Sequence, residues 1–341
     1  MRENVSILID GGRFQNWESV NLNLSLDSID TFGFSTPVQT NNQEFRERFR
    51  PLSYRKLEIR LNDEPILVGV LAPKSATLSE KIASLGGYSR PGLLNDLPVP
   101  FDRYPLEFKN QDLQRIAQQL GAIYDVSVLL SGPIGAPFER ISPEPTQKIL
   151  GFLTELAKKR AVLLSNTLKG ELKFFTPDNS GASTPLRQGE IPLLDAKIDI
   201  DEQNYFTSVT GLGAAQAGRD PEAFTVPLPA LSGVNRPFVY TVSDATGAEL
   251  EAAVKFKAGR IFANAVKISA DVLGWRGANG QIWSPGDFIL LQAPNIWLYN
   301  ETKLRIRTVA LSQTSDDETV SLNLVFPGAY SGELPSKLPW S

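Results

Sequence analysis

Apolar and polar residues alternate along the first part of the chain. From Val20 to Leu26 the even positions are apolar, and Asn21, Asn23 and Ser25 lie between them. A period of two is typical of a half-buried strand. Further short strand-like runs occupy residues 5–9, 31–38, 54–61 and 66–72. Residues 1–95 are therefore predicted to form a small antiparallel β-barrel or sandwich.

The hydrophobic period changes to that of a helix in the next region. Leu113, Ile116, Ala117 and Leu120 are spaced as on one face of a helix. A second helical stripe begins near residues 145–146 and ends at three basic residues, 158–160. A strand at 125–130 and a hairpin at 162–175 accompany these helices. The pattern predicts a small α/β domain over residues 96–186.

Strand-like runs return in residues 187–341, at 266–272, 288–293, 303–312 and 318–326. One helix is embedded among them, at about 246–265. Thr246 and Glu249 have the spacing of a capping box at its start. The predicted fold class is α+β and mainly β, with two strand-rich domains, 1–95 and 187–341, on either side of the α/β domain.

Composition narrows the possible chemistry. The chain has 341 residues and contains neither histidine nor cysteine. Triads that use histidine, zinc-protease motifs and thiolate metal sites are therefore excluded. No cofactor or metal site is expected, and the chain is not expected to be an enzyme. The formal net charge of −4 and the absence of an apolar run of 18 residues predict neither strong nucleic-acid binding nor membrane insertion.

Three motifs resemble binding or catalytic sites only superficially. The glycines of residues 211–218 do not have dinucleotide-fingerprint spacing and lack a βαβ context. Asp199, Asp201 and Glu202 are near neighbours on one segment, and a glycosidase needs two carboxyls that face each other across a substrate. Residues 201–204 could bind a hard cation weakly, but a solvated loop is the favoured interpretation. The acidic run 316–318 lies between two strand patterns and predicts a hairpin turn.

Two of the five tryptophans flank an Asn279-Gly280 turn signal. A two-residue turn would place Arg276 opposite Trp283 and direct Trp275 to the other face, whereas a three-residue turn would oppose the two rings. The pair is interpreted as structural, and a sugar-binding platform is the alternative. The residues expected to serve packing are Trp17, Trp275, Trp283 and Tyr330.

A basic run lies within residues 46–60. Two glutamates interrupt it, so the run is mixed in sign. An inter-subunit or solvated surface is favoured over a nucleic-acid contact. The basic residues are Arg46, Arg48, Arg50, Arg55, Lys56 and Arg60.

Four segments in the same order resemble a known family. They are residues 14–36, with the motif WESV; 50–71; 112–174, which includes DLQRIAQQLGAIYDVSV; and 274–330, which includes GWRGANGQIWSPGD. Together they resemble the baseplate hub, or spike-adaptor, proteins of Mu-like contractile phage tails. That family is related to the hub of T-even phages and to late control protein D.

The resemblance implies a structural virion protein of the tail baseplate, made and assembled in the bacterial host cytoplasm. Its two strand-rich domains would be tube-like barrels. A homotrimeric ring would join the six-fold tail tube, or a distal tail protein, to the three-fold central spike. Baseplate wedge proteins would surround the ring, and tape measure protein and then DNA would occupy its channel. The alternatives are a carbohydrate-binding or cell-wall-degrading tail protein, and the hub of a tailocin or related injection machine.

Overall fold

A computed structural model describes all residues except 1–2, 214–220, 230–232, 243–246, 336 and 341. The chain divides into two compact units. The first comprises Met1–Thr176 with Val309–Val320, and the second comprises Pro177–Thr308 with Ser321–Ser341. The α+β, mainly β class is confirmed. The division at residues 95 and 186 and the closure of each strand region into a barrel remain predictions.

The strands of the first unit form an antiparallel sheet in the order β3-β4-β7-β6-β5-β1-β2. Their side chains alternate between buried and exposed, as the period of two predicts; β4, for example, has Phe32 and Phe34 buried. The elements are β1 (Val5–Ile9), β2 (Gly12–Phe14), β3 (Ser19–Ser25), β4 (Thr31–Pro37), α1 (Gln43–Arg48), β5 (Arg55–Leu61), β6 (Glu64–Thr77) and β7 (Ile82–Ser89).

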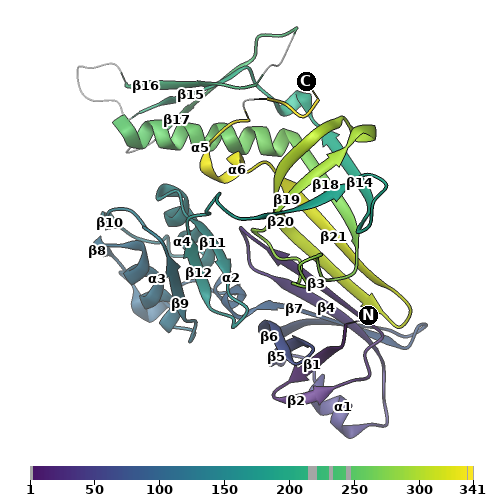
Figure 1. The fold of residues 1–341 in the computed structure, drawn as a ribbon. Helices are drawn as coiled ribbons and strands as arrows, with labels where there is room; N and C mark the ends of the chain where they lie inside the picture. Colours follow the sequence, from purple (N-terminus) through teal and green to yellow (C-terminus); the bar gives the residue numbers. More distant parts are fainter. Residues whose placement is uncertain (1–2, 214–220, 230–232, 243–246, 336, 341) are drawn as a thin grey trace. The chain divides into compact units, whose positions relative to one another are not determined.

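The remainder of this unit is a small α/β subdomain, residues 93–175 (Figure 1). It follows the short helix η1 (Arg90–Gly92), and its parts are α2 (Leu93–Asp96), η2 (Phe101–Arg103), β8 (Phe108–Gln111), α3 (Leu113–Ala122), β9 (Val128–Ser131), β10 (Phe138–Ile141), α4 (Ile149–Lys159), β11 (Leu163–Asn166) and β12 (Leu172–Phe175). Two predictions need correction. Helix α4 begins at Ile149 and not near 145, because Lys148 still has an extended backbone. The strand predicted at 125–130 is β9, which begins at Val128, because the backbone of Asp125 is left-handed, with φ of 56°.

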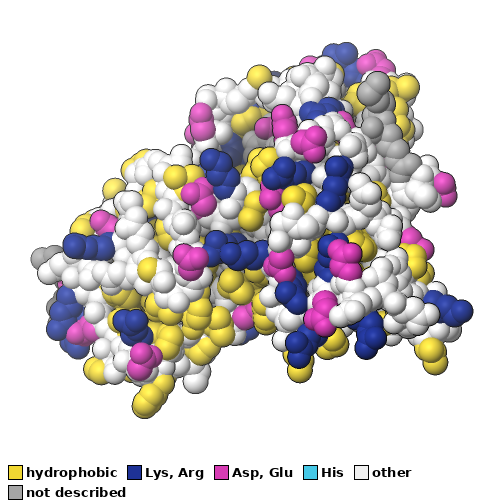
Figure 2. All heavy atoms as spheres, turned by 90° about the horizontal axis from the view of Figure 1, so that it is seen from below, with side chains coloured by type: hydrophobic (Ala, Val, Ile, Leu, Met, Phe, Trp, Pro, Cys, Tyr) yellow, Lys and Arg dark blue, Asp and Glu magenta, His cyan; other side chains and the backbone are white. Residues whose placement is uncertain are grey.

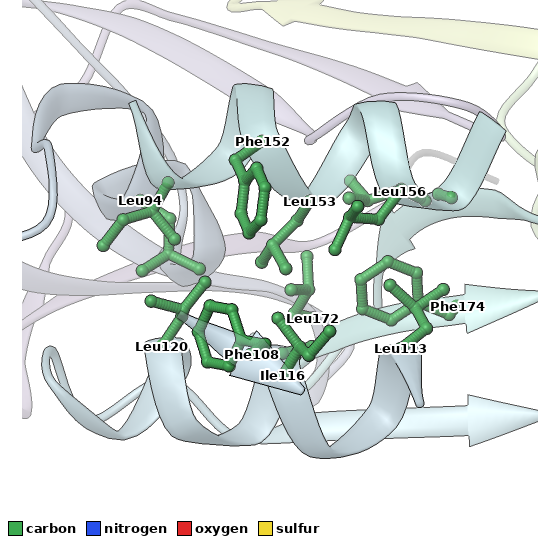
Figure 3. Close-up of a cluster of buried hydrophobic side chains, with 14 of the residues drawn as sticks. Leu94, Phe108, Leu113, Ile116, Leu120, Phe152, Leu153, Leu156, Leu172 and Phe174 are labelled. Carbon is green, nitrogen blue, oxygen red and sulfur yellow. The ribbon is translucent and has the colours of Figure 1, made fainter. Parts of the chain in front are cut away.

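The two helices of the subdomain enclose an apolar core of their own. Figure 3 shows side chains of α3 directed toward those of α4. The ring of Phe108 stacks on that of Phe152, with centroids 6.3 Å apart, and Leu172 and Phe174 are fully buried beside them. The helical stripes that the sequence shows are therefore the inner faces of α3 and α4.

The second unit contains strands of the large sheet and a separate three-stranded sheet that packs against a helix. Its elements are β13 (Ser183–Arg187), β14 (Leu193–Ile200), η3 (Glu202–Asn204), β15 (Ser208–Leu212), β16 (Ala223–Pro227), β17 (Pro237–Thr241), α5 (Gly247–Ala265), β18 (Val266–Leu273), β19 (Phe288–Ala293), η4 (Pro294–Ile296), β20 (Leu298–Thr314), β21 (Glu318–Val325) and α6 (Gly328–Ser331). The hairpin end of β20 and β21 belongs to the first unit. Most pairs are antiparallel, but β13–β19 and β15–β17 are parallel.

Helix α5 packs along the sheet β16-β15-β17 (Figure 1). A Cβ at Gly211 on β15 would lie 2.3 Å from a methyl carbon of Val254 on α5. Gly211 therefore permits close packing of a helix on a sheet. The rest of the apparent glycine motif, 214–218, and the predicted cap at Thr246 lie outside the described residues.

Candidate functional site

The two hairpin tryptophans are interior residues. The bridge pairs Arg276 with Ile282, and the Trp283 N–H donates to the carbonyl of Trp275 at 3.1 Å. The turn thus contains three residues and sets Trp275 opposite Trp283, which is the second of the two registers that the sequence allows. Trp275 is 1% exposed and Trp283 is 3% exposed, which leaves neither ring face open to stack on a sugar.

The other two packing candidates differ in burial. Tyr330 on α6 is buried, and the guanidinium of Arg260 lies 5.6 Å from its ring centroid. Trp17 is half-buried and lines a hollow of about 370 Å³ together with Arg13, Gln15 and Gln313. The packing roles of all four residues remain predictions.

The basic run divides into paired and exposed residues. Arg48, Arg55 and Arg60 form ion pairs with Glu44, Asp10 and Glu58. Within the described part of the chain, Arg46, Arg50 and Lys56 are exposed and form no ion pair. On the face drawn in Figure 2, Lys and Arg side chains lie interspersed with Asp and Glu side chains, as on a mixed-sign surface.

The acidic segments serve local structure. The Asp201 carboxylate accepts hydrogen bonds from the backbone N–H groups of Gln203 and Asn204 and from the Asn204 side chain. These bonds hold the Asp201 pKa below its usual value, and the Asn204 side chain has the largest effect. A turn between β20 and β21 is confirmed, but it comprises residues 315–317 and not 316–318, because Glu318 already begins β21. The described residues contain no group of three or more His, Cys, Asp or Glu that could hold a metal.

Sheet edges are the feature that the sequence interpretation did not identify. β14 lies at one end of its sheet and pairs, among the described residues, with β18 alone. The Asp201 N–H donates to the carbonyl of Ala265 at 2.8 Å, just beyond the ladder. Because successive residues of a strand direct their backbone groups to opposite sides, Ile198 and Ile200 direct theirs away from β18. β14 therefore presents an open edge, a side of the strand without a strand partner.

The side chains of β14 are less buried than those of β18 on the same face of the sheet, as expected for an open edge. Ala196, Ile198 and Ile200 lie on the same face as Ala270, Ile268 and Val266 of β18. The β18 residues are 1–3% exposed, whereas Ala196 and Ile198 are half-buried and Ile200 is 37% exposed. Burial of this apolar face thus decreases abruptly at β14. In the sequence, apolar residues alternate with Lys197 and Asp199, which predicts a half-buried strand but not which of its edges is open.

The second open edge belongs to β6. This strand pairs with β5 up to Leu71 and then continues as far as Thr77, paired only with β7 within the described residues. Lys74 donates from Nζ to the carbonyl of Ser53, which lies within the basic run 46–60. Burial, followed by the charge of Arg55, lowers the Lys74 pKa. The open edge, Lys74–Thr77, therefore lies beside positive charge.

The edge of β2 is closed by a side chain. Arg48 of α1 donates from Nη1 to the carbonyl of Arg13 at 3.2 Å and pairs with Glu44 at 2.5 Å. Its guanidinium also lies 5.8 Å from the ring centroid of Phe14. One arginine thus satisfies an outward carbonyl and covers the strand, a recognised way to block edge pairing.

No helix among the described residues is long and apolar enough to span a membrane.

Comparisons with known proteins agree on one family. Residues 102–176 match the family model described as "Baseplate hub protein gp44-like, second domain". The baseplate hub protein gp44 of Escherichia phage Mu is 23% identical over 336 residues, which cover 93% of this chain and 86% of that protein.

Two solved structures have a similar fold. The 43 kDa tail protein of prophage MuSo2 from Shewanella oneidensis superposes with a TM-score of 0.81 at 18% identity, covering 96% of this chain and all of that one. A tail protein from Neisseria meningitidis MC58 gives 0.81 at 19% identity, covering 97% and 99%. The predicted resemblance to the hubs of Mu-like phage tails is confirmed, and the chain is a baseplate hub-like phage tail protein.

Proposed function

We propose that the chain is the structural hub of a contractile tail baseplate and acts as a homotrimeric ring. The ring joins the six-fold tail tube, or a distal tail protein, to the three-fold central spike. The channel holds tape measure protein and later passes DNA, and baseplate wedge proteins bind outside. The proposal is supported by the family resemblance over most of the chain and by the geometry of the sheet edges.

The observation that carries the proposal is the pair of open edges, β14 and Lys74–Thr77 of β6. An exposed edge strand readily pairs with another chain, and monomeric proteins usually block it. This chain blocks β2 with Arg48, whereas β14 and Lys74–Thr77 of β6 have no strand partner on their outer sides among the described residues. Closure of β2, but not of β14 or of Lys74–Thr77, favours pairing between subunits at the two open edges.

The two open edges carry opposite charge. Residues 190–202 contain five carboxylates and one lysine. The β6 edge adjoins the basic run 46–60, which contains six cations and two glutamates. Charge complementarity of this kind sets the orientation and partner of an interface. It favours pairing β14 of one copy with β6 of the next.

A contact between two different surfaces of the same chain is heterologous, and such contacts close into rings when the rotation permits. Each copy would supply one acidic and one basic edge, so three copies leave neither edge unpaired. In the same pairing, a strand of the neighbouring copy would continue the sheet beyond β14. It would cover part of the apolar face that β14 leaves half-buried. Burial of this face would add hydrophobic stabilisation of about 25 cal/mol for each Å² covered.

The sugar-binding alternative is not favoured by any observation, because both hairpin tryptophans are buried. A hub in a tailocin or related injector would need the same ring and the same open edges. Purification of the chain from infectious virions would distinguish a phage hub from that alternative.

Native mass spectrometry of the purified full chain tests the proposal, followed by imaging of the particles. The expected species has three times the chain mass of 37.4 kDa and a central hole. A species that remains monomeric at high protein concentration, with or without spike protein, would exclude the trimeric hub.

A further inference from the structure

The turn between β3 and β4 forms a reciprocal pair of hydrogen bonds with the end of β11. The Asp30 N–H donates to Oδ1 of Asn166 at 2.8 Å, and Nδ2 of Asn166 donates to Oδ2 of Asp30 at 2.8 Å. The other carboxylate oxygen accepts from the Ser25 N–H at 2.7 Å. Asp30 is 6% exposed, so the α/β subdomain and the strand region share a buried carboxyl group.

The rest of this contact is largely polar. The Ser165 hydroxyl donates to the carbonyls of Ser25 and Ser28 at 2.7 and 3.2 Å. The Arg90 side chain donates to Asp125, and the apolar contribution of the turn is Ile29. Polar contacts of this type resemble those between separable domains.

The α/β subdomain keeps a core that does not depend on this contact. Its buried cluster draws on α2, α3, α4, β8, β11 and β12 (Figure 3). Opening of the turn would therefore expose Ile29 and the polar groups while the core stays packed. Local opening of such a region requires less free energy than global unfolding.

We propose that residues 25–30 act as a clasp that holds the α/β subdomain against the strands of the first unit, and that the clasp opens more readily when Asp30 is ionised. The charged side chains on the segments packed around Asp30 are Asp27 on the same turn, Arg90 after β7, and Lys169 and Glu171 after β11. Arg90 interacts with Asp125, and Glu171 accepts from the hydroxyl of Thr167.

Burial raises the pKa of Asp30 to about 6, although the hydrogen bonds from Asn166 and Ser25 oppose the rise. In the open clasp the group is hydrated and its pKa returns toward the ordinary 3.8. Closing therefore favours the protonated form. The extra stability of the closed clasp is fully present below pH 3.8 and is lost as the pH rises through about 6.

Hydrogen exchange of the full chain, followed by mass spectrometry at pH 4 and pH 7, tests the clasp. The reporter amides are those of Ser25, Asp30 and Ser89; the last donates to the carbonyl of Asp30. After correction for intrinsic exchange, their opening constants should rise roughly 100-fold from pH 4 to pH 7, because each pKa unit is a tenfold change. Amides of the β5–β6 ladder serve as an internal control, and their opening constants should not change between the two pH values.

Two variants sharpen the test. Asp30→Asn removes the titrating group and should abolish the pH dependence at the reporter amides. Ser28→Ala keeps the carbonyl that Ser165 uses and should behave as the unmodified chain. The proposal is overturned if the unmodified chain shows equal opening at both pH values, if Asp30→Asn keeps the dependence, or if the β5–β6 amides change in parallel. The comparison of the two pH values and the comparison with the β5–β6 amides use the unmodified chain, so they do not require a variant to fold.

Discussion

β2 and β14 are both terminal strands, but the chain treats their outer edges differently. At β2, Arg48 bonds an outward carbonyl and covers the ring of Phe14. At β14, outward backbone groups and a half-covered apolar face remain without a strand partner among the described residues. β2 is three residues long and β14 is eight. The proposed pairing between copies requires this difference, because only an open edge can accept a strand of another copy.

Of the substitutions considered, proline should give the largest difference in assembly between the β14 edge and the β2 edge. Ile198→Pro removes an outward donor of β14 without removing a bond to β18, and proline is tolerated only at unpaired edges. We expect assembly to weaken by about 100-fold or more, because the neighbouring strand loses a ladder bond and meets the proline ring. Sedimentation velocity measures the change.

The matched control is Arg13→Pro on β2. Its outward carbonyl is already bonded to Arg48, so this edge is not used for assembly and the trimer should persist. Equal loss of assembly in both variants would contradict the distinction between the two edges. Circular dichroism of each variant verifies that its fold is retained.

Reversal of charge at the open edges should have an intermediate effect. Asp199→Lys places a cation on the acidic edge, and we expect about a tenfold weaker assembly, or about 1.4 kcal/mol. Arg50→Glu in the same chain should restore part of the loss, because it reverses the opposing edge. The affinity is measured at low and high salt, since screening should reduce the difference. Failure of the double variant to recover would remove the charge argument for β14–β6 pairing.

Opening the closed edge should have the smallest effect. Arg48→Ala removes a bond to the Arg13 carbonyl, an ion pair with Glu44 and the cover over Phe14. We expect a loss of about 1 kcal/mol in the free energy of unfolding, with concentration-dependent aggregation through β2. Arg46→Ala on the same helix is exposed and serves as the control. Urea unfolding and light scattering measure the two effects, and equal behaviour of both variants would contradict the role given to Arg48.

The sequence predicts local structure better than it predicts these edges. The alternation in β3 predicts a strand and its buried face, and the helical stripe of α3 predicts a helix and its buried face. Both predictions were confirmed. The burial of Trp275 and Trp283 agrees with the structural interpretation, but the sequence left open whether the turn between them contains two or three residues. An Asn-Gly pair predicts a turn but does not determine how many residues the turn contains.

The edges could not be predicted because they depend on which strands pair. Residues 193–200 show the alternation of a strand, but nothing local says that β18 covers one side and leaves the other open. Likewise, Arg48 closes β2 across 35 residues of sequence. Non-local pairing of this kind follows from the fold and not from hydrophobic periodicity.

Cross-linking between introduced cysteines tests the central claim most directly, because the chain contains none of its own. Ser75→Cys marks the β6 edge and Ile198→Cys marks the β14 edge, and a short bismaleimide tolerates small differences in register. We expect cross-linked dimers only when the two single variants are mixed, and a covalently closed trimer when one chain carries both cysteines. Cross-linking of either single variant with itself, or a native trimer that gives no cross-link, would contradict the β14–β6 contact.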